Sequence, residues 1–347
     1  MIVDKNYCMS SFLSFRCIDD ENKAFEEDLK PRRFHPPTDR YPVRTSEDID
    51  KFIRKVLQDK LDENTGIMLS GGIDSAILAS YMPPGTKAYT LKCMAEGALE
   101  ETERAKIIAD KCNLDHRIVE VHWEDYLQLV PKLMKHKGAP LHSIEPQIYK
   151  AALQAKNDGI TRLVFGESAD SIFGGLNGLM SKDWLFDEFV DRYTFVNPEK
   201  VLRNPVSVQE PFERYRVGSG IDFYKFVSEF FYTESVASYT NALSLANVEF
   251  IAPFVQMYMD VPLDLTRVRN GDSKYLVREL YKKIYPDYVM APKIPMPRAV
   301  TQWLANWDGP KRSEFLPNSI DGFKGDQKWL VYCLEWFLNL LDDGEIA

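Results

Sequence analysis

Residues 66–82, GIMLSGGIDSAILASYM, decide how this chain folds. The apolar run GIMLS has the pattern of a buried strand, the adjacent Gly71 and Gly72 form a turn, and an apolar helical segment begins at once. Because glycine has no side chain, the backbone can turn so that successive amide groups point inward, and the first turn of the helix adds amides of its own. The stretch therefore predicts a strand, an anion-binding turn and a helix.

The side chains around this turn indicate what it binds. Ser70 and Ser75 supply hydroxyl donors, but the carboxylate of Asp74 would repel a bare anion. A divalent cation between Asp74 and phosphate oxygens removes that conflict, and Mg²⁺ is the natural candidate. The run lacks the lysine of a Walker loop and the glycine spacing of a dinucleotide-binding loop. The alternative is a glycine turn and a capped helix that bind nothing.

Outward from this turn, short apolar runs alternate with helical stretches. The predicted elements follow in the order KAYTLKC (87–93), a helix over 101–112, RIVEVH (117–122), a helix from Trp123, a helix around 146–156 and RLVFG (162–166). Such alternation implies a parallel sheet with helices covering it. We therefore expect a doubly wound α/β fold with a parallel sheet.

The remaining sequence divides into a lead-in, a main domain and a tail. Residues 19–41 are charged and then rich in proline, so residues 1–44 are expected to be an irregular lead-in ahead of the organised part. Thr45 and Asp48 have the spacing of a capping box, which predicts a helix at the start of a domain over 45–312. Residues 313–347 are expected to form a helical tail packed on that domain. The half beyond Gly175 is mostly helical, with predicted core aromatics at Trp184, Phe186, Phe189, Phe223, Phe226, Phe230 and Phe231.

Composition limits the class of protein. Of the 347 residues, 45% are hydrophobic and 27% charged, which describes a folded soluble chain with a large core. The net charge of −9, without a basic stripe, argues against a nucleic acid partner, and no apolar run is long enough for a membrane span. The start lacks the features of a secretory leader, and the five cysteines form no CxxC pair. We therefore expect a cytoplasmic protein with no disulfide framework and no cysteine zinc site.

A second polar loop, GESADSIFGG (166–175), follows the predicted strand RLVF. Parallel α/β sheets gather their ligands at the carboxyl ends of their strands, so this loop should lie near the first. Asp170 is then a second magnesium ligand opposite Asp74, and Glu167 is placed to act on a substrate as a base or an orienting group. A helix cap with acidic residues in its first turn is the alternative.

Both loops resemble those of a known family. SGGIDS is similar to the signature of the ATP pyrophosphatase superfamily, and the second loop resembles the GEGSDE-V-FGG signature of the asparagine synthetases and β-lactam synthetases. The order of further stretches agrees over about residues 45–298: Glu100-Glu101, HSIEPQIYKAALQAK, ANVEFIAPF, SKYLVRELYKKIYPDYV and Lys293. The resemblance implies a Rossmann-like fold of the adenine nucleotide alpha-hydrolase type. It also implies an ATP- and Mg²⁺-dependent ligase that adenylates a carboxylate, releases pyrophosphate and transfers the acyl group to ammonia or an amine.

The resemblance also implies roles for single residues. Asp74 and Asp170 would hold the magnesium, and Leu69 and Leu91 would flank the adenine. The nucleotide-binding set as a whole is Leu69, Ser70, Gly71, Gly72, Asp74, Ser75, Leu91 and Gly166. The catalytic set is Glu167, Lys274 and Lys293, of which the two lysines would contact phosphates and stabilise developing charge. Solvated surface lysines are the alternative for both.

The departures from the family concern its substrates. The family's glutaminase domain does not fit ahead of residue 45, so ammonia is expected to be free or to come from a separate glutaminase, unless the substrate is itself an amine. Asn241-Ala242 replaces an Asp-Arg pair, and Ile251 stands at an arginine position. Because arginine forks bind carboxylates, these changes indicate either a differently charged substrate or a rebuilt network in the scaffold.

Two other functions stay open from the sequence. One is a nucleotide-binding homologue, or a subunit of a biosynthetic complex, that keeps the ATP site without turnover. The other is a sulfur-inserting RNA enzyme of the same superfamily, which the acidic charge and the missing CxxC pair disfavour. The expected partners are therefore a small-molecule carboxylate and ammonia or an amine, with no nucleic acid and no membrane.

Overall fold

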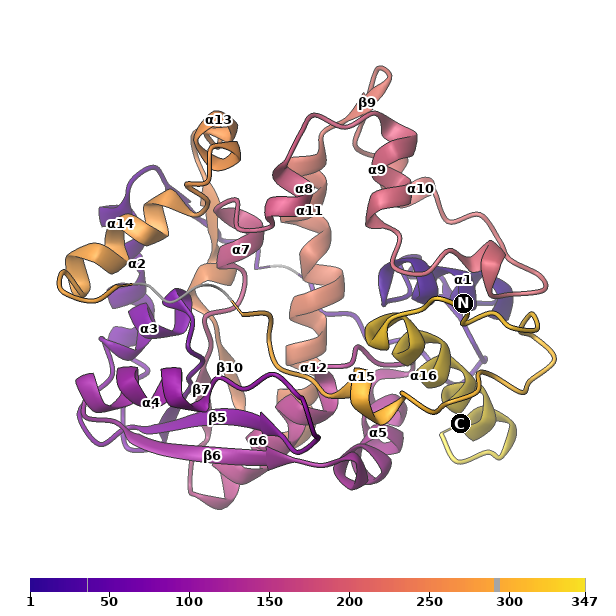
Figure 1. Ribbon diagram of the computed structural model, residues 1–347, viewed down its shortest axis with the longest axis horizontal. Helices are drawn as coiled ribbons and strands as arrows, with labels where there is room; N and C mark the ends of the chain where they lie inside the picture. The colour runs from indigo at the N-terminus through magenta and orange to yellow at the C-terminus, as the bar shows by residue number, and fades with distance from the viewer. Residues whose placement is uncertain (36, 290–293, 347) are drawn as a thin grey trace.

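The computed structural model describes residues 1–35, 37–289 and 294–346 (Figure 1). Within these ranges the largest sheet has five strands, all parallel, in the order β10-β7-β4-β5-β6. The strands are β4 Thr65–Met68, β5 Lys87–Cys93, β6 Asp115–Val121, β7 Arg162–Val164 and β10 Glu249–Ile251. The predicted strands of the sheet are confirmed, and β10 is an additional edge strand.

Helices cover the sheet on both faces. One face carries α2 Ser46–Gln58, α3 Ile73–Ala79, α4 Thr102–Lys111 and α14 Tyr275–Ile284, and the other carries α5 Trp123–Lys137, α6 Glu145–Asn157 and α12 Ala237–Ala246. Helices α4 and α6 pack on opposite faces of β5 and β6, because their buried residues belong to the two different cores. Successive side chains of a strand point to opposite faces of the sheet. In β4, Ile67 packs in the core under α2 and α3, whereas Met68 packs in the core under α5 and α6.

The strand order reverses direction at β4. From β4 the chain adds β5 and β6 on one side, and then crosses to add β7 and β10 on the other. This is the doubly wound arrangement, and its ligands bind in the crevice outside the carboxyl ends of the strands at the reversal. The predicted fold class is confirmed, and it brings the end of β4 next to the end of β7.

The start of α2 has the predicted capping box. The Thr45 hydroxyl accepts a hydrogen bond from the Asp48 amide at 3.3 Å, and the Asp48 carboxylate accepts one from the Thr45 amide at 3.0 Å. These bonds satisfy two amide groups that the helix leaves unpaired at its first turn. Ile49, Phe52, Ile53 and Leu57 then face the core on one side of the helix.

The first 44 residues are more ordered than the sequence indicates. Helix α1, Lys5–Phe15, is buried over its last eight residues, and β3, Tyr41–Val43, pairs with β11, Met257–Met259. The expectation that organised structure begins only after this segment was wrong. Helix α1 was missed because it is buried on almost all sides and so has no polar face. Its buried serines, Ser10, Ser11 and Ser14, also give it a sequence unlike that of a typical apolar core helix. The division into three domains stays a prediction.

The second half of the chain is mostly helical, as expected. Its further helices are α7 Ala169–Ile172, α8 Asn177–Met180, α9 Phe186–Tyr193, α10 Glu210–Glu213, α11 Phe223–Phe231, the π-helix Tyr232–Val236, α13 Leu265–Arg269, α15 Val300–Trp303 and α16 Gly325–Asp342. Two 3-10 turns, Pro198–Lys200 and Pro253–Gln256, and two small pairs, β1 Ile2–Val3 with β2 Lys23–Ala24 and β8 Arg216–Val217 with β9 Gly220–Ile221, complete the elements. Of the predicted core aromatics, Trp184 and Phe231 are only partly buried, and the other five are buried.

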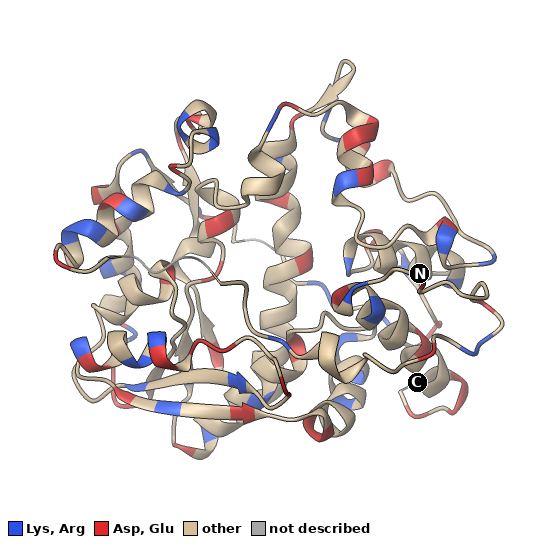
Figure 2. Ribbon diagram, in the orientation of Figure 1, with Lys and Arg blue, Asp and Glu red and all other residues tan. Residues whose placement is uncertain are grey.

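Charge and hydropathy on the helices give two further findings. In Figure 2, acidic and basic residues lie close together on elements such as α4 and α14, so neither helix presents a surface of one sign. Among the helices of the described ranges, none has both the length and the apolar character needed to cross a membrane.

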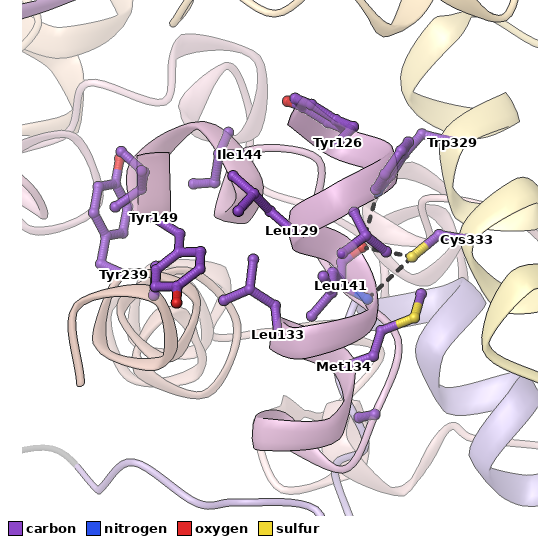
Figure 3. Packing of buried hydrophobic residues seen from close by; sticks show 14 of the residues in the cluster. Tyr126, Leu129, Leu133, Met134, Leu141, Ile144, Tyr149, Tyr239, Trp329 and Cys333 are labelled. Carbon is purple, nitrogen blue, oxygen red and sulfur yellow. Dashed lines mark hydrogen bonds between the residues drawn. The ribbon is translucent and has the colours of Figure 1, made fainter. Parts of the chain in front are cut away.

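The tail helix α16 packs beside α1 and α5, near both ends of the chain (Figure 1). Figure 3 shows the contact: the Trp329 indole donates to the Leu141 carbonyl at 2.9 Å, and the Cys333 sulfur lies 3.2 Å from the Leu141 amide nitrogen. Trp329 and Cys333 are both fully buried. The tail is therefore part of the core rather than an appendage.

Trp329→Ala is expected to lower the free energy of unfolding by about 3–5 kcal/mol, because it empties a fully buried site and removes the indole donor from the Leu141 carbonyl, which keeps only the weaker Cys333 thiol. Chemical denaturation measures this loss. Trp336→Ala, on the partly buried side of the same helix, is the control and should cost less than half as much. Equal losses in the two variants would contradict the assignment of Trp329 to the core.

Candidate active site

A cavity of about 270 Å³ lies at the carboxyl ends of β4 and β7. It is the place where the strand order reverses, so it is where a doubly wound fold binds its ligand. Its walls include all of the predicted nucleotide-binding set, together with Glu167, Asp170 and Lys274. The other described residues that line it are Met68, Ile73, Glu101, Arg104, Ile148, Phe165, Gly175, Asn177, Tyr239, Ser273, Arg278, Ile294 and Met296.

The first loop is held in shape by its own serines. The Ser75 hydroxyl accepts from the Ser70 amide at 3.1 Å and lies 2.9 Å from the Ser70 hydroxyl. The Ser70 hydroxyl also accepts from the Gly72 amide at 3.2 Å. Both serines line the cavity, but Ser75 is buried and its hydroxyl is bonded within the loop. Direct contact of Ser75 with a phosphate stays a prediction.

Two glycines allow close approaches that no other residue permits. A Cβ at Gly71 would lie 2.5 Å from the Arg104 Cβ, and a Cβ at Gly166 would lie 2.9 Å from the Ser75 amide nitrogen and 3.0 Å from the Asp74 Cβ. The end of β7 is therefore pressed directly onto the first loop. This contact explains the glycine at each position and sets the spacing between the two loops.

Asp74 and Asp170 converge on one cation, the ammonium group of Lys274. The Lys274 Nζ lies 2.7 and 2.9 Å from the two oxygens of Asp74 and 3.0 Å from Oδ1 of Asp170. The Lys274 side chain is only 6% exposed, so the alternative of a solvated surface lysine is wrong for this residue. The structure thus brings together the two predicted metal ligands and one predicted catalytic lysine.

The Lys274 ammonium remains charged in this position. Burial by itself would lower its pKa, but the carboxylates of Asp74 and Asp170 outweigh that effect and the pKa of Lys274 is raised. Its backbone has a φ of 52°, in the left-handed region, directly before α14 begins. Such a conformation costs energy for a residue with a side chain, and it is often found at functional sites.

The two aspartates fit a magnesium ion. In the described ranges no group of three or more His, Cys, Asp and Glu residues is arranged to hold a metal. Mg²⁺ does not need such a group, because it is commonly bound by one or two carboxylates, with substrate phosphates and water as its other ligands. Asp74 and Asp170 are hard oxygen donors at the cavity wall, and they already share one cation. The donor set therefore suits Mg²⁺ brought in with a phosphate ligand.

Glu167 lines the same cavity and contacts Tyr239 of α12. Burial raises the pKa of its carboxyl group to about 7, although hydrogen bonds from Tyr239 and Ser235 oppose this shift. The Ser235 hydroxyl donates to it at 3.1 Å. A carboxyl group with a pKa near 7 can accept a proton and release it again near neutral pH.

Other site residues were missed from the sequence. Burial raises the pKa of Glu101 to about 7, against a hydrogen bond from the Gly71 amide, so this carboxyl group lies at the first loop. Arg104 packs on Gly71, and the Arg278 Nε donates to the Ser273 carbonyl at 2.6 Å. The acidic pair Glu100-Glu101 could have indicated Glu101 as a site residue, but the sequence analysis used the pair only for its order among the stretches that resemble the family. Tyr239 gave no signal of its own.

The remaining predicted residues divide into two groups. Leu69 and Leu91 are buried and line the cavity at the ends of β4 and β5. Lys293 lies outside the described residues. The roles assigned to the predicted site residues stay predictions, whereas their convergence on one cavity is a finding.

The two departures from the family pattern lie in the scaffold. The buried Asn241 side chain donates to Glu145 at 2.8 Å and has its Oδ1 2.8 Å from the His136 Nδ1. The same Glu145 carboxylate accepts from the buried Lys137 ammonium at 2.5 Å. Ile251 is 4% exposed and packs in the core. A rebuilt interior network therefore accounts for Asn241, and core packing accounts for Ile251.

The sequence matches the model of one family, Asparagine synthase, over residues 53–312. The glutamine-hydrolysing asparagine synthetase 1 of Bacillus subtilis is 25% identical over 377 residues, which cover 87% of this chain and 57% of that protein. A putative glutamine-hydrolysing asparagine synthetase 1 of Methanocaldococcus jannaschii is 24% identical over 163 residues, 46% of this chain and 30% of that protein. The chain thus spans little more than half the length of the first relative and less than a third of the second.

Two solved structures are also similar in part. The U34-tRNA thiolase NcsA of Methanococcus maripaludis has a TM-score of 0.27 and 16% identity, covering 72% of this chain and 82% of that chain. The NMN synthetase of Francisella tularensis has a TM-score of 0.27 and 11% identity, covering 72% and 97%. The fold assignment rests on the strand order described above. Because the family match spans most of the chain and includes both loops, this chain belongs to the asparagine synthase family.

Proposed function

We propose that this chain is an ATP- and Mg²⁺-dependent amide ligase that activates a carboxylate as its adenylate and transfers the acyl group to ammonia or an amine. The observation that carries the proposal is the meeting of Asp74 and Asp170 at one cation position beside the glycine loop. Family membership supports the same class of reaction.

In the first step, an oxygen of the substrate carboxylate attacks the α-phosphorus of ATP, and the bond between the α-phosphorus and its bridging oxygen breaks. Pyrophosphate leaves with that oxygen. The backbone of Ser70, Gly71 and Gly72 would bind the pyrophosphate, and Asp74 and Asp170 would hold Mg²⁺, which supplies positive charge to the phosphates. With Mg²⁺ held by Asp74 and Asp170, the Lys274 ammonium would be able to donate to a phosphate oxygen where charge develops.

In the second step, the amine attacks the carbonyl carbon of the adenylate, and AMP leaves. The attacking nitrogen must lose a proton, and Glu167 is the carboxylate at the cavity wall suited to accept it. The nitrogen donor in this proposal is free ammonia, ammonia from a separate glutaminase, or an amine on a second substrate.

The products test this scheme directly. Incubation with ATP, Mg²⁺, ammonia and a panel of carboxylic acids should release AMP and pyrophosphate in equal amounts. Asp74→Asn should abolish the release. The formation of ADP and phosphate as the only products would contradict the scheme.

One observation favours a second candidate, a nucleotide-binding homologue without turnover. Lys274 already occupies the position between the two aspartates, as a permanent internal counter-ion would. Calorimetry that finds tight binding of ATP, together with no pyrophosphate release from any acid, would favour this candidate over the ligase.

The pH dependence of the second step tests the role of Glu167. Because the pKa of its carboxyl group is raised to about 7, this group is protonated below that pH and cannot accept a proton. At a fixed concentration of unprotonated amine, single-turnover amide formation from preformed adenylate should therefore rise with pH through about 7, and Glu167→Gln should be slow and independent of pH over this range. A wild-type rate that does not change between pH 5.5 and 8 would exclude Glu167 as the base.

The same raised pKa affects stability. Between the usual carboxyl pKa of 4.5 and about 7, the folded chain holds a proton on Glu167 that the unfolded chain has released. The contribution of this group to stability is therefore present at low pH and is lost as the pH rises through about 7. Glu167→Gln should remove this part of the pH dependence of unfolding.

A further inference from the structure

The cavity has two walls of opposite character. The wall at the first loop carries the described cationic side chains that line the cavity, Arg104, Lys274 and Arg278. Around Glu167 the wall is apolar or aromatic: Phe165 after β7 contacts Tyr239 on α12, Tyr239 contacts Met296, and Ile148 on α6 belongs to the same core. A ligand that spans the cavity therefore meets charge at one end and apolar surface at the other.

The apolar wall is built from side chains that pack on one another. The rings of Phe165 and Tyr239 meet edge to face with centroids 5.4 Å apart, and Tyr239 stacks on Phe250 at 5.8 Å. The Tyr239 hydroxyl lies 3.8 Å from the Met296 sulfur. Aromatic contacts of this kind fix the rings in place, so the wall is a preformed surface.

The order of the strands in the sheet separates this apolar wall from the expected position of the adenine ring. Leu69 and Leu91 lie at the ends of β4 and β5, on one side of the phosphate loop. Phe165 and Glu167 follow β7, which pairs with β4 on the side away from β5. With the adenine at the leucines, the apolar wall is left for the acid that attacks the α-phosphate.

Charge on this side of the cavity disfavours a second carboxylate. Arg298, a cation whose charge acts on Tyr239, is engaged elsewhere, since it binds Asp326 through two hydrogen bonds of 2.7 and 2.8 Å. A second carboxylate would instead face Glu167 against an apolar surface. Burying an unpaired charge there is costly, whereas burying hydrocarbon is favourable.

We infer that the activated substrate is a monocarboxylic acid with an apolar body, which lies against Phe165, Tyr239 and Met296, with its carboxylate directed toward the phosphate loop. This inference rests on the proposed function and names its substrate class. Phe165 and Met296 are then residues that determine specificity.

The test compares matched acids in acid-dependent exchange of labelled pyrophosphate into ATP. Hexanoate and adipate differ in that a methyl group is replaced by a carboxylate, and leucine and aspartate provide a matched pair of amino acids. The apolar member of each pair should be favoured in kcat/KM on the order of 10²-fold. Calorimetric binding of each acid in the presence of a non-hydrolysable ATP analogue gives a readout that does not depend on turnover.

A variant tests the wall itself. Met296→Lys places a cation on the apolar wall and should shift the preference toward the dicarboxylic member of each pair by at least about tenfold. Met94→Lys is the matched control, since Met94 is 36% exposed and is not among the described residues that line the cavity, and its preference should equal that of the wild type.

The outcomes separate this inference from the proposed function. Exchange that favours adipate or aspartate in the wild type overturns the inference and leaves the ligase proposal standing. An equal preference in wild type and Met296→Lys also overturns the inference. No exchange with either class, together with tight binding of ATP and Mg²⁺, overturns the ligase proposal and the inference with it.

Discussion

Lys274→Met is expected to lower acid-dependent pyrophosphate exchange by on the order of 10²- to 10³-fold. The substitution keeps most of the buried hydrocarbon stem but removes the ammonium that lies within 3.0 Å of both Asp74 and Asp170. In the proposed reaction this cation moves to a phosphate oxygen, so its loss removes stabilisation at the point where charge develops. Exchange assays at saturating ATP measure the effect.

The same variant has a second expected phenotype, which does not depend on turnover. Without Lys274 the two carboxylates repel each other, which should lower the free energy of unfolding in metal-free buffer by about 1–3 kcal/mol. Added Mg²⁺ should then stabilise the variant more than the wild type, because metal no longer competes with the ammonium for the same oxygens. Thermal unfolding with and without Mg²⁺ measures the difference.

Lys182→Met is the control for both effects. Lys182 has a side chain that is 49% exposed and pairs with Glu188 on the surface. Exchange and Mg²⁺-dependent unfolding should both match the wild type in this variant. If Lys274→Met also kept wild-type exchange and showed no added response to Mg²⁺, Lys274 would be a scaffold residue only.

Gly175→Ala is expected to reduce exchange by on the order of 10²-fold. A Cβ at this position would overlap Oδ1 of Asp170 and lie 2.8 Å from Cδ of Lys274, so both side chains must move. Gly175 does not have a positive φ, so alanine brings no backbone strain of that kind and the clash is the main effect. The cost in unfolding free energy should be about 1–3 kcal/mol.

A second glycine variant separates the clash from general damage. Gly344 has a φ of 70°, and a Cβ added there would have no atom within 4 Å, so Gly344→Ala introduces strain of about 1–2 kcal/mol at a residue that is not among those lining the cavity. It should be less stable than the wild type and equally active. An active Gly175→Ala would show that the position of Asp170 does not matter for turnover.

Much of the fold was predictable because local patterns agree with the final structure. The run KAYTLKC was predicted to be a strand, and it is strand β5 over the same residues. The helix predicted from Trp123 begins at that residue, and the Thr45 capping box is formed as expected. These signals are contained within a few residues of each other, so they can be read without knowing what packs against them.

The elements that were missed depend on tertiary contacts. Helix α1 has no polar face because it is buried on almost all sides. Strand β10 has only three residues and is recognisable as a strand only by its pairing with β7. Burial on all sides removes the periodicity that marks an amphipathic helix, and a very short edge strand carries too few residues for an alternating pattern.

The site was predictable to a similar extent. The glycine loop and Asp170 were found because each motif is continuous in the sequence, and the strand order then brings them together. The contact between Lys274 and Asp74 joins residues 200 positions apart, so the place of the lysine between the two aspartates appears only in the folded chain. The raised pKa values of Glu101 and Glu167 come from burial, which the sequence does not display.

The central claim is that Asp74 and Asp170 hold one metal ion together with the triphosphate. Electron paramagnetic resonance of Mn²⁺, used in place of Mg²⁺ with a non-hydrolysable ATP analogue, measures this most directly. We expect Mn²⁺ to bind with the nucleotide in the wild type and to be lost in Asp74→Asn and in Asp170→Asn, while the surface control Asp183→Asn keeps it. Equal binding of Mn²⁺ and nucleotide in the wild type and in both site variants would contradict the account.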